Sequence, residues 1–133
     1  MSKLNVEELR EVLVNKLSGK GFRIRESHRV KGFSGVIHEF DILVEEDDKR
    51  CAINLCRNEV TIELIKAIAL YIDTKIPQIM VCKEYKKDLD KMVRGSNIKV
   101  SIVPAENLDM VIEKIVEYLS SALNRAKIFP SNV

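Results

Sequence analysis

The sequence predicts one α/β domain in which helices flank a mixed β-sheet. Three strand-like segments joined by short turns come first, and later strand-like segments alternate with helical patterns. Apolar residues make up 46% and charged residues 32% of the 133 residues, which is the balance of a folded globular domain. We expect the order α-β-β-β-α-β-α-β-α, one domain over residues 1–127, and a C-terminal tail at 128–133.

The charge balance excludes a disordered polyelectrolyte. Lys and Arg number 22 and Asp and Glu 20, for a net charge of +2, so a nucleic-acid surface would need local clustering of cations. No apolar run reaches the about 18 residues of a membrane-spanning helix. The N-terminal segment is charged and amphipathic, unlike a signal sequence, so we expect a cytoplasmic protein.

The cysteines fit the same compartment. Cys51, Cys56 and Cys82 are odd in number and show no CxxC spacing, and His28 and His38 are the only histidines. We therefore expect three small buried thiols, with neither a disulfide framework nor a zinc site.

The first helix is predicted over Asn5–Leu17. Asn5 is a favourable N-cap, and two acidic residues follow in the first turn, where they suit the helix dipole. The apolar stripe at helical spacing consists of Val6, Leu9, Val12, Leu13 and Leu17.

Three strands are predicted next. The segment Phe22–Val30 alternates between two faces, and a glycine-rich turn leads into the apolar strand Ile37–Val44. The acidic run Glu45–Asp48 forms a solvated loop before Cys51–Cys56. This third strand is almost continuously apolar, which is typical of a strand covered on both faces.

The remaining elements alternate between helix and strand. A helix over Thr61–Asp73 is apolar nearly all round, so it should pack on two sides. Strands are predicted over Gln78–Cys82 and Lys99–Val103, and helices over Lys86–Arg94 and Asn107–Asn124.

The second strand carries two carboxylates. Glu39 and Asp41 point the same way, and two carboxylates on one strand face can hold a divalent cation such as Mg²⁺. The alternative is that both face solvent. The residues then facing the core are His38, Phe40, Ile42 and Val44.

The run His38-Glu39-Phe40-Asp41-Ile42-Leu43, with Gly21-Phe22 after the first helix, resembles the restriction-endonuclease-like superfamily of PD-(D/E)xK nucleases. The resemblance is to the Mrr-type and archaeal Holliday-junction resolvase-like branch, and it covers residues from about Asn5 to Val103. It implies a metal-binding Asp on the second strand, a Glu on the third, and a Lys two residues after that Glu. Asp41 matches the Asp. Asn54 stands in place of the Glu and Cys56 in place of the Lys.

These departures imply a degenerate catalytic site. Asn54 carries no negative charge and Cys56 no fixed cation, so Asp41, with Glu39 nearby, is at most a weak Mg²⁺ ligand. Losing one group of a concerted site removes several orders of magnitude in rate. The resemblance therefore implies a pseudoenzyme that binds DNA or serves as the partner subunit of an active nuclease, with no cofactor.

An active site rebuilt from the following helix is the first alternative. Some superfamily members move the carboxylate or lysine there, and Glu63 and Lys66 occupy that helix. Asp41, Glu39, Glu63 and Lys66 would then form a Mg²⁺-dependent DNA endonuclease. Otherwise Glu63 and Lys66 are a solvated helix face.

A basic ribbon is predicted on the first strand. Four cations alternate along it, with one more just before it, and such a row suits a phosphate backbone. They are Lys20, Arg23, Arg25, Arg29 and Lys31. Two alternatives stay open: a solvent-facing strand paired with the acidic run at 45–48, and a protein-interaction scaffold that never binds nucleic acid.

The apolar helix at 61–73 also bears on assembly. Resolvase relatives form two-fold dimers, so the resemblance implies a homodimer. The alternative is burial of this helix under the long C-terminal helix of the same chain.

Overall fold

A computed structural model describes residues 5–124 of the chain; the predicted tail at 128–133 lies outside these residues. The helices are α1 (Val6–Gly19), α2 (Val60–Thr74), α3 (Lys87–Arg94) and α4 (Leu108–Ala122). The strands are β1 (Arg23–Lys31), β2 (Ile37–Glu46), β3 (Lys49–Leu55), β4 (Gln78–Cys82) and β5 (Val100–Pro104). The mixed α/β class is therefore confirmed, whereas the restriction-endonuclease-like class stays a prediction.

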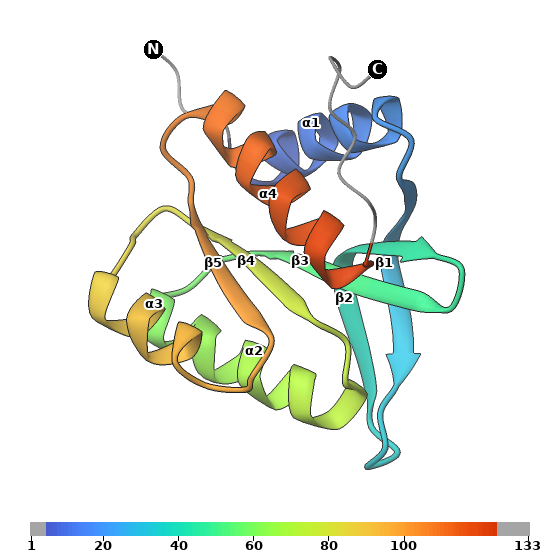
Figure 1. Cartoon of the computed structure of the whole chain (residues 1–133), viewed down its shortest axis with the longest axis vertical. Helices are drawn as coiled ribbons and strands as arrows, with labels where there is room; N and C mark the ends of the chain where they lie inside the picture. The colour runs from blue at the N-terminus through green and yellow to red at the C-terminus, as the bar shows by residue number, and fades with distance from the viewer. Residues whose placement is uncertain (1–4, 125–133) are drawn as a thin grey trace.

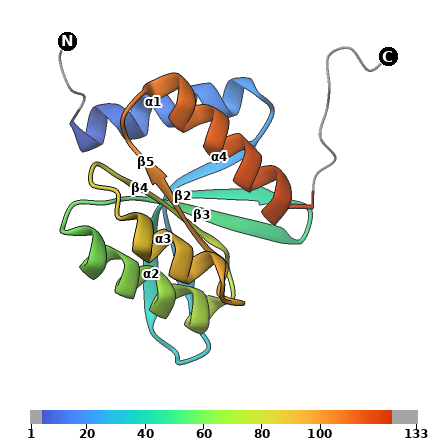
Figure 2. The same cartoon turned by 60° about the vertical axis from the view of Figure 1, so that its left-hand side comes forward.

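One five-stranded sheet has the order β1-β2-β3-β4-β5. The first three strands pair antiparallel, and β3, β4 and β5 pair parallel. The helices cover the two faces in pairs, with α1 and α4 on one side and α2 and α3 on the other (Figures 1 and 2). Since α4 lies across the sheet from α2, the predicted alternative in which α4 buries α2 is wrong.

The first and last helices begin at the residues that the sequence indicates. The Asn5 side chain accepts the Glu8 amide at 2.8 Å, and the Glu8 carboxylate accepts the Asn5 amide, which forms a capping box. Asn107 likewise caps α4 through the Met110 amide. The buried faces of these two helices pack with β2 and β3 in the largest of the three core clusters.

The alternation of β1 and β2 breaks in the middle of the pair. Ile24 packs in the cluster beneath α1 and α4, but Val30 packs with Phe40 and Leu43 on the other side of the sheet. Val30 lies six positions after Ile24, an even spacing, so a regular strand would place the two side chains on one face. Ser27 lies between them with a φ of 46°. The predicted alternation of Phe22–Val30, which places Ile24 and Val30 on one face, is therefore wrong.

The tip of the β1–β2 hairpin is fastened to the end of α2. Asp73 accepts the Ser34 amide at 2.8 Å and the Ser34 hydroxyl at 2.7 Å, and His38 Nε2 lies 2.6 Å from its Oδ2. The Phe33 amide donates to the Asp73 carbonyl at 2.8 Å. A Cβ at Gly32 would lie 2.0 Å from Asp73 Oδ2, so only glycine permits this approach.

This anchor makes stability depend on pH. Hydrogen bonds from His38 and then Ser34 hold the pKa of Asp73 at about 2, below its ordinary value. A lowered folded-state pKa stabilises the fold above the unfolded value near 4, and the benefit is lost as pH falls from about 4 to about 2. In urea denaturation, the free energies of unfolding of wild type and Asp73→Asn should differ at pH 6 and become equal as the pH falls toward 2. A difference that does not change with pH would contradict this assignment.

Candidate functional site

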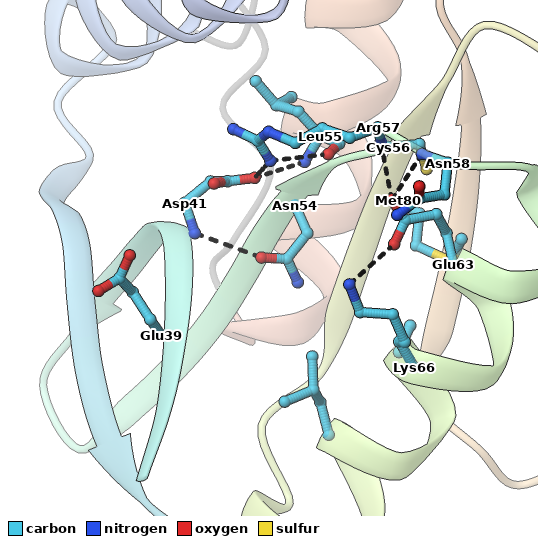
Figure 3. Close-up of a pocket in the computed structure, with 12 residues that line it drawn as sticks. Glu39, Asp41, Asn54, Leu55, Cys56, Arg57, Asn58, Glu63, Lys66 and Met80 are labelled. Atoms are coloured by element: carbon cyan, nitrogen blue, oxygen red, sulfur yellow. Dashed lines mark hydrogen bonds and ion pairs between the residues drawn. The ribbon is translucent and has the colours of Figure 1, made fainter.

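A cavity of about 150 Å³ opens where β3 ends and α2 begins (Figure 3). Its walls come from β2, β3, β4, α2 and the link between β3 and α2. All six candidate catalytic residues line it: Glu39, Asp41, Asn54, Cys56, Glu63 and Lys66. The residues that the resemblance assigns to a catalytic site therefore lie together in the structure.

Asp41 is held by hydrogen bonds and an ion pair. Its Oδ2 accepts the Leu55 amide at 2.8 Å and Arg57 Nη1 at 3.0 Å. Arg57 also donates to the Leu55 carbonyl at 3.1 Å and lies 3.6 Å from Glu7 of α1. The hydrogen bond with Asp41 raises the pKa of Arg57. The Arg57 guanidinium therefore lies beside Asp41 and is bonded to Oδ2. A metal ion at this position would need that carboxylate oxygen to be free.

The Asn54 side chain is also held by hydrogen bonds. Its Oδ1 accepts the Asp41 amide at 3.3 Å, and its Nδ2 donates to Gln78 Oε1 at 2.8 Å. Gln78 is buried and donates in turn to the Ile76 carbonyl. This chain of amides satisfies the polar groups without any charge, so Asn54 forms a structural link between β2, β3 and β4.

Cys56 is not a free thiol. It forms a disulfide with Cys82, with a Cα–Cα distance of 5.0 Å, and joins the ends of β3 and β4. The expectation of three unpaired thiols is therefore wrong, because β3 and β4 are parallel neighbours whose ends meet at one edge of the sheet. Cys51 matches that expectation: it is free and buried, and burial raises its pKa to about 12.

Glu63 and Lys66 lie on the first turns of α2. Glu63 Oε2 accepts the amides of Arg57 and Asn58 at 2.7 and 3.1 Å, and Lys66 lies 3.5 Å from its other oxygen. Burial raises the pKa of Glu63, but the two amides and Lys66 outweigh burial and lower it overall. Glu63 thus acts as an anchor for the β3–α2 link.

Glu39 turns away from the centre of the cavity, as Figure 3 shows. It pairs with Arg29 at 3.3 Å on the surface. In residues 5–124, no group of three or more His, Cys, Asp or Glu side chains is placed to hold a metal ion. The residues present therefore do not fit the Mg²⁺ site of a two-carboxylate nuclease.

Arg57 is the residue of the candidate site that the sequence analysis missed. The resemblance places the catalytic lysine at the position of Cys56, and Arg57 is the next residue. A cation directly after that position was the feature of the sequence that could have indicated Arg57. The partners of Arg57 are 16 and 50 residues away, at Asp41 and Glu7, and nothing local indicates them.

The cations of the predicted basic ribbon are exposed but do not share one face. Arg25 pairs with Glu45, and Arg29 pairs with Glu39. Because the face of β1 changes at Ser27, the cations before and after it point to opposite sides. The one-sided ribbon is therefore wrong as geometry: Arg23 and Arg25 form one group, and Arg29 and Lys31 a second.

Comparisons with known proteins place the fold. No family model matches the chain. An uncharacterized protein of Archaeoglobus fulgidus is 27% identical over 117 residues, which cover 80% of this chain and 91% of that protein. The crystal structure of AF1548, a protein of unknown function, matches with a TM-score of 0.58 and 16% identity over 86% of this chain and 77% of that one.

A second solved structure is similar over the same region. Can2 from Sulfobacillus thermosulfidooxidans, in complex with cyclic tetra-adenylate, matches with a TM-score of 0.59 and 12% identity. The match covers 85% of this chain but 32% of Can2, so the chain spans about a third of that protein. At these identities the likeness shows a shared fold. No helix within residues 5–124 is long and apolar enough to cross a membrane.

Proposed function

We propose that this protein binds nucleic acid without hydrolysing it. The observation that carries the proposal is the Asp41–Arg57 pair, in which a cation of the chain replaces the ion that nuclease chemistry needs. The neutral Asn54 and the disulfide-bonded Cys56 complete the change from a metal site to a structural site. The likeness to Can2, solved with a cyclic nucleotide, supports a ligand with phosphate groups.

Binding is assigned to the exposed cations around β1. Arg23 and Lys20 show no ion-pair partner within the part of the chain that the structure describes, and Arg29 and Lys31 extend along the hairpin. The Arg29–Glu39 pair is exposed and weak, so a phosphate can compete for Arg29. Such contacts make affinity fall steeply with salt.

Fluorescence anisotropy tests the binding. Labelled duplex, single-stranded and four-way-junction DNA are titrated over a range of salt concentrations. The double variants Arg23→Gln/Arg25→Gln and Arg29→Gln/Lys31→Gln should each weaken binding about tenfold and reduce the salt slope by about one for every phosphate that the variant no longer binds. Lys114→Gln, an exposed cation on α4, is the matched control and should have no effect. No binding to any of the three DNAs would favour a protein-interaction scaffold.

Incubation of the same DNAs with Mg²⁺ or Mn²⁺ tests the absence of hydrolysis. Intact DNA is the expected result. Cleavage that disappears in Asp41→Ala and in Glu63→Gln would overturn the proposal and support the endonuclease rebuilt around Asp41, Glu63 and Lys66. Binding and cleavage are thus decided by separate measurements.

A further inference from the structure

A second cavity, of about 300 Å³, lies at the other end of the parallel strands from the cavity around Asp41. The cavity around Asp41 is at the C-terminal end of β3, whereas the first residues of β4 and β5, Gln78 and Val100, line the second cavity. The end of α3 and the last turns of α4 complete its walls. The described residues that line it include no candidate catalytic residue and no cation of β1, so it is a separate site.

Positive charge and apolar side chains share the lining of the second cavity. Its charged residues are Arg94, the last residue of α3, and Lys99, directly before β5, and none of the described lining residues is acidic. Hydroxyl groups of Ser101, Tyr118 and Ser121 also line it. This combination suits a ligand with an anionic group and an apolar body. The apolar part of the lining includes Pro77, Ile79, Val93, Ile98, Val100 and Ala122.

Arg94 is held in place by residues from both layers of helices. Its Nε donates to Asp90 of α3 at 3.1 Å, and its Nη2 donates to the Tyr118 hydroxyl of α4 at 3.0 Å. The Asp90 side chain is 7% exposed and also accepts the Tyr85 hydroxyl. Within residues 5–124 the remaining nitrogen of the Arg94 guanidinium, Nη1, has no hydrogen-bond partner. A guanidinium fixed in this way is preorganised to bind an anion.

Lys99 and two hydroxyl groups add further donors. Within the part of the chain that the structure describes, the exposed Lys99 ammonium forms no ion pair and no hydrogen bond. The hydroxyls of Ser101 and Ser121 form no hydrogen bond with those residues either. An anionic group in the cavity would therefore gain charge-assisted hydrogen bonds without breaking any that these three side chains now make.

We propose that the second cavity binds a small phosphate monoester whose organic part is an apolar ring. Arg94 and Lys99 bind the phosphate oxygens, and the apolar part of the lining contacts the ring. The two cations and the two free hydroxyls match the three acceptor oxygens of a phosphate better than the two oxygens of a carboxylate. A volume of about 300 Å³ is at the lower end for ligand pockets, so it suits a ligand of this size better than a nucleic-acid chain. This site goes beyond the nucleic-acid surface proposed around β1 and does not depend on it.

NMR titrations of the isotope-labelled full chain test the proposal. Phenyl phosphate should shift the amide signals of Lys99, Ser101 and Ser121 in a saturable way, with a Kd of about 1 mM. Inorganic phosphate lacks the ring and benzoate lacks the phosphate, so each should bind about tenfold more weakly. No saturable shift of these amide signals with phenyl phosphate, or equal affinity for the three probes, would overturn the proposal.

Variants locate the phosphate. Lys99→Gln should raise the Kd of phenyl phosphate about tenfold, and it breaks no ion pair within residues 5–124. Ser121→Phe, at an exposed residue of the lining, keeps both cations but fills the cavity, so it should abolish saturable binding. Lys91→Gln removes an exposed cation of α3 that lies outside the lining, and this matched control should leave the Kd unchanged.

The same spectra show whether each variant is folded. A folded Lys99→Gln or Ser121→Phe variant with the wild-type Kd would overturn the proposal, as would an equal rise in Kd in Lys91→Gln. DNA is absent from these titrations, so their outcome is separate from that of the nucleic-acid binding measurements.

Discussion

Asp41→Ala is expected to lower the free energy of unfolding by about 2–3 kcal/mol. The substitution leaves the Leu55 amide without the acceptor that now lies 2.8 Å away, in a residue that is almost fully buried. It also removes the main partner of Arg57. Arg57 is half exposed, so water offsets part of that second loss. Urea unfolding followed by circular dichroism gives the value.

The sign of this change separates two kinds of carboxylate. Catalytic acids are commonly held at a cost in stability, so their removal often stabilises a protein. A carboxylate whose role is to bind an amide and an arginine stabilises the fold, so its removal lowers the free energy of unfolding. An unchanged or higher stability of Asp41→Ala would contradict the structural role. In a double-mutant cycle, Arg57→Ala should cost less in the Asp41→Ala background than in wild type.

Phe40→Ala is expected to cost about 3–5 kcal/mol, a larger loss of stability than that of Asp41→Ala. Phe40 is fully buried and lies in a small cluster with Leu43, Ala52 and Ile76, which fixes the outer half of β2 against the end of α2. Such a small cluster has few neighbours that can move into the space, so the cavity should persist. Chemical denaturation should show a lower midpoint with an unchanged m-value.

Met110→Ala is the control for Phe40→Ala. Met110 is 59% exposed on α4, and its truncation should change stability by less than about 0.5 kcal/mol. A loss at Phe40 that is no larger than the loss at Met110 would mean that β2 does not cross to the α2 side where the structure places it.

Local patterns in the sequence predicted most of the elements. Periodicity of apolar residues located the helices and strands, and the Asn5 cap began α1 where expected. The three positions that the family resemblance assigned on two neighbouring strands, Asp41, Asn54 and Cys56, also line one cavity.

The switch of faces in β1 could not be predicted in this way. Nothing in the residues around Ser27 marks a positive φ, because serine fits a regular strand equally well. The switch follows from the position of β1 and β2, which are covered by α1 and α4 at one end and by the end of α2 at the other. A single strand that serves two layers must turn its apolar side from one to the other.

By itself, the sequence determined the mixed α/β class and the Asn5 cap, and it showed that Asn54 and Cys56 stand where the resemblance would place an acidic group and a lysine. Only the tertiary structure decided that Arg57 pairs with Asp41, that Cys56 bonds Cys82 across 26 residues, and that the isoleucines on the outer side of α2, at 62, 65 and 72, are exposed within the part of the chain that the structure describes. The physical reason is range: periodicity and capping act within a few residues, whereas ion pairs, disulfides and burial depend on segments that only the folded sheet brings together.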